Sequence, residues 1–181
     1  MTLGGMLGPG RVTRAEITAH LDPLDKQARI AECLALSKEQ LKRLWHLAST
    51  EPGEAQELVG ERGTAVFAGR NSLRVFTRFE KRFSRSAGAI IGYNRHSLGR
   101  LIGPGYFTVT AAPSGLLFDY SKMPEQAPDG WPRVTPNTQG FAKPVYGGLL
   151  DDAAWVARNV IIGSARRGDV SLDSYFILAR V

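Results

Sequence analysis

The sequence predicts an α+β fold that is mainly β, with a short N-terminal helical segment packed on an antiparallel β-barrel or a strongly curved sheet. Three observations support this prediction. Helix-capping patterns recur in the first fifty residues, β-branched and aromatic residues dominate from about residue 60, and glycines divide that second part into short runs. A chain of 181 residues is long enough to form one domain with its own hydrophobic core.

The chain divides into three consecutive parts. Residues 1–12 carry no helix or strand signal, and we expect a flexible N-terminus there. Residues 13–55 are expected to be helical and residues 60–181 to form the barrel-like domain, the two making one structural unit. Within that domain, residues 123–144 contain five of the ten prolines. A stiff segment of this length predicts an ordered loop that crosses the surface or covers an opening.

Three helix-start patterns occur in the N-terminal segment. Residues 13–16 and 37–40 match the capping box, in which a hydroxyl and an acidic or amide side chain satisfy each other's backbone N–H groups. Asp22 before Pro23 places a capping acceptor ahead of a proline suited to the first helical position. Apolar residues then recur at helical spacing, and we expect three short helices packed by their apolar faces.

The second part of the chain contains seven candidate strands. They cover residues 64–68, 73–83, 88–94, 105–112, 115–121, 159–166 and 174–181. Residues 149–158 fit either a short helix or the start of a long strand.

The segment 73–83 fits both helical and extended periodicity. As a strand, its odd-numbered positions form an apolar face that only Lys81 interrupts, and its even-numbered positions form a polar face that only Phe76 interrupts. As a helix, its arginines and phenylalanines also separate onto different faces, so periodicity alone does not decide. The abundance of Val, Thr and Phe and the absence of Ala favour a strand.

Seven or eight mostly antiparallel strands joined by hairpins favour a closed or nearly closed barrel, since closure removes exposed sheet edges. This arrangement resembles small lipocalin-like ligand barrels at the level of the fold. The resemblance implies a cavity for a small molecule, but no sequence motif carries it, and a fold alone does not determine function.

The net charge of +6 is concentrated in one segment. Residues 61–100 contain nine basic and two acidic side chains, whereas the rest of the chain is nearly balanced. A concentrated positive charge predicts an anionic neighbour, which is either a small ligand or a nucleic acid. The alternative is a solvated sheet face whose arginines pair with acidic side chains.

Several classes of protein are disfavoured by the composition. The single cysteine, Cys33, excludes an intramolecular disulfide and a multi-cysteine metal site. The adjacent Asp151 and Asp152 lack further oxygen ligands nearby, so we expect no metal and no cofactor. The N-terminus lacks a secretory-signal pattern, and no apolar run approaches the ~20 residues of a membrane span, so a cytoplasmic protein without membrane contact is expected.

The candidate ligand-binding residues were chosen by strand position and side-chain chemistry. They are Arg78, Arg82, Tyr93, Asn94, Asp119, Tyr120 and Trp155. An aspartate facing a barrel interior needs a basic partner, so we expect Asp119 to contact Arg78 or Arg82. The leading hypothesis is non-enzymatic binding of a small anionic or amphipathic ligand in the cavity or mouth of the barrel.

Three other functions remain open at this stage. Residues 70–100 are a candidate nucleic-acid surface, since aromatic side chains interleaved with basic ones can stack on bases. An enzyme acting on a small acidic substrate would use His96 or Asp119 as acid or base. A structural or protein-interaction module would use the helices as its contact surface.

Overall fold

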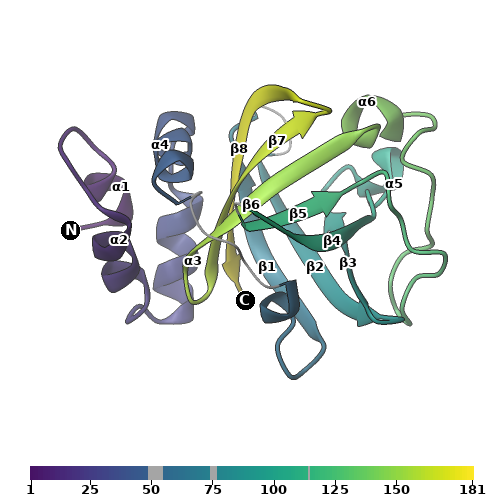
Figure 1. The fold of residues 1–181 in the computed structure, drawn as a ribbon, viewed down its shortest axis with the longest axis horizontal. Helices are drawn as coiled ribbons and strands as arrows, with labels where there is room; N and C mark the ends of the chain where they lie inside the picture. The colour runs from purple at the N-terminus through teal and green to yellow at the C-terminus, as the bar shows by residue number, and fades with distance from the viewer. Residues whose placement is uncertain (49–54, 74–76, 114) are drawn as a thin grey trace.

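The computed structural model describes residues 1–48, 55–73, 77–113 and 115–181, and within them eight antiparallel strands close into a barrel (Figure 1). The strands are β1 (Thr64–Asn71), β2 (Arg78–Ser86), β3 (Ala89–Arg95), β4 (Phe107–Ala112), β5 (Gly115–Asp119), β6 (Leu149–Ala157), β7 (Val160–Arg167) and β8 (Val170–Arg180). Each strand pairs with the next in the chain, and β8 pairs with β1. The predicted fold class is confirmed: the protein is mainly β, with helices at the N-terminus of a barrel that is lipocalin-like in its architecture.

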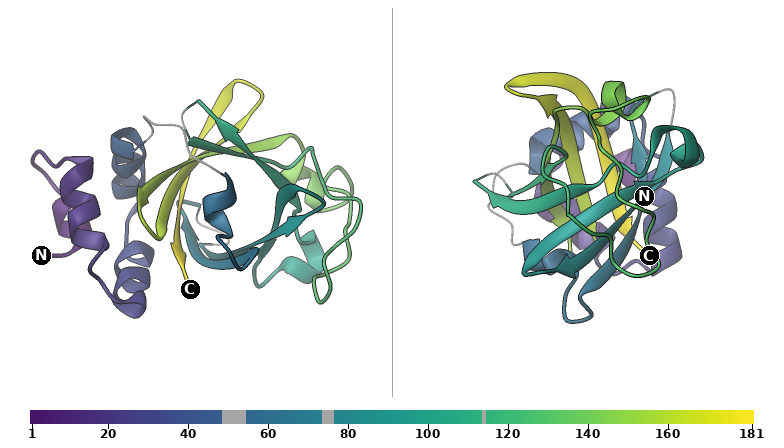
Figure 2. Two further views of the ribbon diagram at one scale, coloured as in Figure 1. Left: turned by 60° about the horizontal axis from the view of Figure 1, so that its bottom comes forward. Right: turned by 90° about the vertical axis from the view of Figure 1, so that its right-hand side faces the viewer.

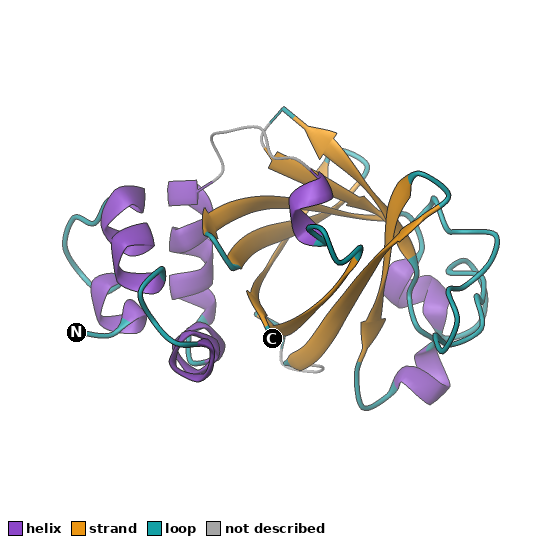
Figure 3. Ribbon diagram, turned by 90° about the horizontal axis from the view of Figure 1, so that it is seen from below, coloured by secondary structure: helices purple, strands orange, loops and turns teal. Residues whose placement is uncertain are grey.

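Four helices precede the barrel and lie against one side of it (Figures 2 and 3). They are α1 (Leu3–Met6), α2 (Arg14–Leu21), α3 (Lys26–Leu34) and α4 (Lys38–Ala48). Their apolar side chains form one core with the outward-facing residues of β6, β7 and β8. The described residues also form the short helices η1 (Ala55–Leu58), α5 (Gly99–Ile102) and α6 (Ala142–Tyr146).

Two of the three predicted helix starts are confirmed. Thr13 and Glu16 form the capping box of α2, and Ser37 forms the same reciprocal pair with Gln40 at the start of α4. The third prediction was wrong, because α3 is capped by Asp25, whose side chain accepts from the N–H of Ala28. Asp22 instead ends α2 and accepts from the backbone N–H of Arg158.

The first twelve residues contain a helix where the sequence predicts a flexible segment. Leu3 and Leu7 are buried in the core shared by the helices and the barrel. The backbone N–H of Leu3 donates to Glu32 at 2.6 Å, and the guanidinium of Arg43 donates to backbone carbonyls of this segment. The two buried leucines and these long-range hydrogen bonds stabilise the N-terminal segment, whose sequence has no strong helical signal of its own.

The segment 73–83 is extended from Arg78 onward, as the composition indicates. Residues 74–76 lie outside the described part of the chain, so Val75 and Phe76 are not placed. Within β2 the side chains alternate, with Phe83 and Lys81 buried inside the barrel. Residues 149–158, for which two structures fitted the sequence, form strand β6.

Strands β7 and β8 are apolar on both faces. In β7, Ile161 faces the barrel interior, while its neighbours Val160 and Ile162 face the helices. Covering the outside of a strand in this way makes its sequence a continuous apolar run rather than an alternating one. The uninterrupted runs in the last quarter of the sequence therefore mark the face of the barrel on which the helices pack.

Glycines shape the inside of the barrel by leaving room for aromatic rings. Three of them lie directly opposite phenylalanines on the neighbouring strand, namely Gly69 opposite Phe79, Gly92 opposite Phe107, and Gly163 opposite Phe176. A Cβ atom on Gly163 would lie 2.1 Å from Cζ of Phe176. Each ring therefore lies across the backbone of the adjacent strand, an arrangement that also helps to fix the strand register.

The Pro-rich segment is an ordered loop on the side of the barrel away from the helices (Figure 1). Trp131 contacts Tyr93, with ring centroids 4.7 Å apart, and the hydroxyl of Tyr106 donates to the carbonyl of Pro132 at 2.6 Å. The side chain of Asn137 donates to the carbonyls of Tyr106 and Tyr120. These contacts anchor the loop on the outside of β3 and β4 and lead it into α6.

We predict that Gly163→Ala lowers the free energy of unfolding by about 1–3 kcal/mol, because the new methyl group must displace the ring of Phe176. Denaturant unfolding measures the change. Gly99→Ala is the matched control, since Gly99 has no atom within 4 Å of the added Cβ and no positive φ. Equal stability of the two variants would contradict the close contact between Gly163 and Phe176.

Candidate functional site

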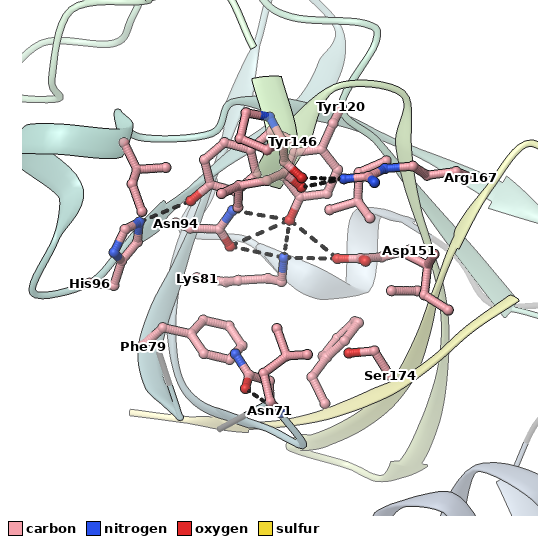
Figure 4. Close-up of a pocket in the computed structure, with 18 residues that line it drawn as sticks. Asn71, Phe79, Lys81, Asn94, His96, Tyr120, Tyr146, Asp151, Arg167 and Ser174 are labelled. Atoms are coloured by element: carbon pink, nitrogen blue, oxygen red, sulfur yellow. Dashed lines mark hydrogen bonds and ion pairs between the residues drawn. The ribbon is translucent and has the colours of Figure 1, made fainter. Parts of the chain in front are cut away.

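A cavity of about 320 Å³ lies at the end of the barrel where β1 ends and β2 begins (Figure 4). Its wall is largely apolar and includes Phe79, Ile102, Val145, Leu149 and Phe176. Polar groups project into it from several strands, and the largest group of them surrounds Lys81. A concave, mainly apolar site with a few convergent polar groups is typical of small-molecule sites.

Lys81 lies at the inner end of this cavity, and its side chain is only 2% exposed. Its Nζ donates to Asn94 Oδ1 at 2.9 Å, to the Tyr120 hydroxyl at 2.5 Å and to Asp151 Oδ2 at 3.1 Å. The Tyr120 hydroxyl also accepts from Asn94 Nδ2 at 3.0 Å and lies 3.2 Å from Asp151 Oδ2, to which it donates. All three ammonium protons therefore have an acceptor, which a buried charge requires.

The four residues come from strands that closure of the barrel brings together. Lys81 on β2 and Asn94 on β3 are direct cross-strand partners. Tyr120 immediately follows β5, and Asp151 lies on the neighbouring β6. Seventy positions separate Lys81 from Asp151 in the chain. Only the curvature of the sheet places these side chains across the interior from each other.

Aromatic rings surround the ammonium group on its other sides. Nζ lies 4.6 Å from the ring centroid of Phe107, 5.2 Å from that of Phe176 and 5.3 Å from that of Phe118. The negative face of an aromatic ring attracts a cation, and the attraction is stronger where water is excluded. These rings continue into the packed phenylalanine core at the other end of the interior.

Burial shifts the ionisation of the whole group toward its uncharged forms. Desolvation lowers the pKa of Lys81 below its ordinary value, against the opposing effect of Asp151. Desolvation likewise raises the pKa of Asp151, although the nearby ammonium favours its carboxylate. The pKa of the Tyr120 hydroxyl is raised well above its usual range, so this group stays protonated and can both donate and accept.

Tyr146 and His96 form a second polar pair at the cavity wall. The Tyr146 hydroxyl lies 2.9 Å from Nε2 of His96, and its ring stacks on Tyr120 at 5.5 Å with an interplanar angle of 4°. Burial lowers the pKa of His96, which favours the neutral imidazole. Gly105 makes the position of Tyr146 possible, because a Cβ there would lie 2.4 Å from the ring.

Two of the seven candidate residues lie in this cavity, Asn94 and Tyr120. Arg78 and Arg82 occupy the alternate positions of β2 and point away from the interior, where Arg82 pairs with Glu80 at 3.0 Å. Neither arginine lines the cavity, although both were predicted to contact a ligand in the cavity or at its mouth. The alternation of β2 was correctly deduced, but the arginines belong to its outer face.

The expected contact of Asp119 with Arg78 or Arg82 was also wrong. Asp119 lies on the outer face of β5 and accepts from the backbone N–H and hydroxyl of Ser121 at 2.9 and 2.6 Å. Its carboxylate also pairs with Lys122 at 3.4 Å. Local partners in the turn after β5 satisfy this carboxylate, so it needs no arginine and does not reach the cavity.

The remaining two candidates lie elsewhere. Tyr93 is on the outer face of β3, covered by Trp131 of the Pro-rich loop. Trp155 is four residues beyond Asp151 on β6, and its ring contacts Phe67 in the packed part of the interior. Neither side chain forms part of the cavity wall.

Lys81 and Asp151 were not predicted from the sequence as site residues. The signal for Lys81 was present, since within residues 73–83 it is the one charged side chain at the odd-numbered positions. The ammonium group of a lysine on an apolar strand face must either pair with a carboxylate or extend to solvent. Asp151 and Asp152 point to opposite faces of β6, and Asp152 pairs with Arg166 at 2.6 Å, so the two carboxylates do not share an ion.

Two of the alternative functions lose part of their support. The phenylalanines of β2, Phe79 and Phe83, face the interior and are not available to stack on bases. The apolar faces of α2, α3 and α4 are occupied by the barrel. His96, considered as an acid or base, does lie at the cavity wall, whereas Asp119 does not.

No helix in the described part of the chain is long and apolar enough to cross a membrane. Comparison of the chain with protein-family models, with curated proteins and with solved structures found no match.

We predict that Lys81→Met lowers the free energy of unfolding by about 3–5 kcal/mol, because it leaves the carboxylate of Asp151 buried without its cation. The double variant Lys81→Met/Asp151→Leu should regain most of this loss, since it removes both buried charges. Denaturant unfolding of the two single variants and the double variant completes a double-mutant cycle. Additive effects of the two substitutions would contradict a direct pair.

Proposed function

We propose that the protein binds a small amphipathic ligand, with the apolar part of the ligand in the cavity and an acidic group at its mouth beside Arg167. One observation carries the proposal: the cavity is apolar over most of its wall, open to solvent at one end, and carries one uncompensated positive charge among the lining residues that the structure describes. Its volume of about 320 Å³ is near the lower end of the range for small-molecule sites, roughly 300–1,000 Å³.

Three of the described side chains that line the cavity are Lys, Arg or Asp. Lys81 and Asp151 form a buried ion pair and offset each other. Arg167 remains, at an exposed position on the cavity wall near the end of β7, where it donates to the backbone carbonyls of Pro144 and Val145. An arginine held in this way supports recognition of a carboxylate or a phosphate, to which its guanidinium can donate two parallel hydrogen bonds.

The surroundings of the inner end of the cavity favour a ligand that carries no second charged group at that end. Lys81 already has three oxygen acceptors, so a deep anion would have to displace one of them. The rings of Phe79 and Phe176 face the same space and favour an apolar group there. The ligand is therefore expected to enter with its apolar end first.

We predict that 1-anilinonaphthalene-8-sulfonate, an amphipathic anion, binds in the cavity and is displaced by octanoate. Ala165→Phe should abolish this binding, because the new ring occupies the cavity that Ala165 lines. Fluorescence titration measures the affinity. The matched control is Thr110→Phe, which adds the same ring on the exposed outer face of β4. Unchanged binding by Ala165→Phe would contradict the proposed location.

We predict further that Arg167→Ala weakens the binding of octanoate about tenfold and leaves the binding of 1-octanol unchanged, because only the carboxylate pairs with the guanidinium. Competition with the same fluorescent probe gives both affinities. Arg158→Ala removes an exposed arginine from the turn between β6 and β7 and controls for net charge. Equal losses for acid and alcohol would show that Arg167 does not contact the acidic group.

A further inference from the structure

We propose that Lys81 binds an apolar aldehyde or ketone covalently, as a protonated imine formed at Nζ inside the cavity. This inference rests on the proposed function and names the ligand class more closely, since it requires the cavity to admit an apolar molecule. It goes further by assigning a bond-forming role to a group that the ligand-binding proposal treats only as half of an ion pair.

The first support is the position of the amine. Of the six lysines, Lys81 alone lies inside the barrel, and the other five are exposed among the described residues. Its Nζ is at the inner end of an apolar cavity, where it would meet a carbonyl group carried on the apolar part of a ligand. Imine formation releases water, and an enclosed apolar site favours the dehydrated product over its hydrolysis.

The second support is the pair of proton-transfer groups in contact with Nζ. Asp151 Oδ2 lies 3.1 Å from Nζ, and the Tyr120 hydroxyl lies 2.5 Å from Nζ and 3.2 Å from the same carboxylate oxygen. Imine formation requires an amine that can lose a proton and an acid that can protonate the departing oxygen. Both groups are within hydrogen-bonding distance before any ligand arrives.

The third support is the balance of charge. Burial disfavours the ammonium of Lys81 and the carboxylate of Asp151 alike, so transfer of one proton between them yields a neutral amine and a neutral acid in the same site. The lone pair of a desolvated lysine is then available as a nucleophile. The product imine carries one positive charge, which the carboxylate of Asp151 balances again.

The reaction balances without an oxidant or a reductant. Asp151 takes a proton from Lys81, and the free amine adds to the carbonyl carbon, so that a C–N bond forms and the carbonyl electron pair moves to oxygen. The Tyr120 hydroxyl gives this oxygen a proton and takes one from nitrogen, leaving a carbinolamine. Asp151 returns its proton to the hydroxyl group, the C–O bond breaks, water leaves, and the nitrogen lone pair completes the C=N bond. Ammonium and carbonyl compound thus become iminium and water.

Asn94 holds the amine in place for this step. Its Oδ1 accepts from Nζ and its Nδ2 donates to the Tyr120 hydroxyl, so one amide fixes both groups. Asn94 Nδ2 also donates to the carbonyl of Gly105, which fixes the amide itself. Asn94 therefore contacts the reacting nitrogen directly and orients it, although it neither gives nor takes a proton in this step.

The test is reductive trapping of the full chain with octanal and sodium cyanoborohydride at pH 7, followed by intact mass and peptide mapping. We expect one octyl group at Lys81, and we expect 1-octanol to suppress it by competing for the cavity. The N-terminal amine is the internal reference, since its labelling depends on exposure and is not suppressed by 1-octanol. Mapping on the unaltered protein avoids any effect of substitution on folding.

A conservative variant tests the proton relay separately. Tyr120→Phe should slow trapping at Lys81 about a hundredfold relative to trapping at the N-terminal amine, because the ring remains and only the hydroxyl is lost. Tyr175→Phe is the matched control, with its hydroxyl on the helix-covered side of the barrel next to Asp173. Equal trapping rates in the two variants would overturn the role of Tyr120.

The outcomes separate this inference from the proposed function. One outcome is that the N-terminus and the exposed lysines are labelled but Lys81 is not, while 1-octanol still displaces the fluorescent probe. This outcome overturns the imine and leaves the ligand-binding proposal in place. If neither octanoate nor 1-octanol displaces the probe, the proposed function fails, and the imine fails with it. An octyl group at Lys81 that 1-octanol suppresses supports both.

Discussion

A positive charge buried inside the barrel is the constraint on which the rest of the interior depends. An ammonium group among phenyl rings is strongly disfavoured unless it is paired and fully hydrogen-bonded. Lys81 meets this condition with oxygens from Asn94 on β3, from Tyr120 directly after β5 and from Asp151 on β6. The barrel must therefore keep these strands in register for the charge to be tolerated.

The same group divides the interior into two parts. Beyond Lys81, phenyl rings such as those of Phe83 and Phe107 pack edge to face, with centroids 5.8 Å apart, and fill the barrel. On the other side lies the cavity, whose wall includes the rings of Phe79 and Phe176, each lying across a glycine of the neighbouring strand. A polar cluster between a packed core and an apolar cavity gives any ligand a chemically distinct inner end.

Much of the fold follows from local rules. Capping boxes at Thr13 and Ser37 start their helices because the hydrogen bonds involved span only three residues. The composition of residues 73–83 predicts a strand, and the predicted alternation of its side chains between two faces agrees with the burial of Phe83 and Lys81 on one face of β2. The rules fail where tertiary contacts supply the stability, as at Leu3 and Leu7, which fold onto a core formed by distant strands.

The sequence by itself determined that the chain forms helices followed by antiparallel strands in a barrel or a strongly curved sheet, because periodicity, caps and turns act over a few residues. It also separated the two faces of β2 correctly. Only the tertiary structure decided the site: closure of the sheet turned the arginines outward, and it placed Lys81 beside Asp151, seventy positions away in the chain. Alternation shows which side chains share a face, but the partners of a buried charge depend on which distant strands face each other across the interior.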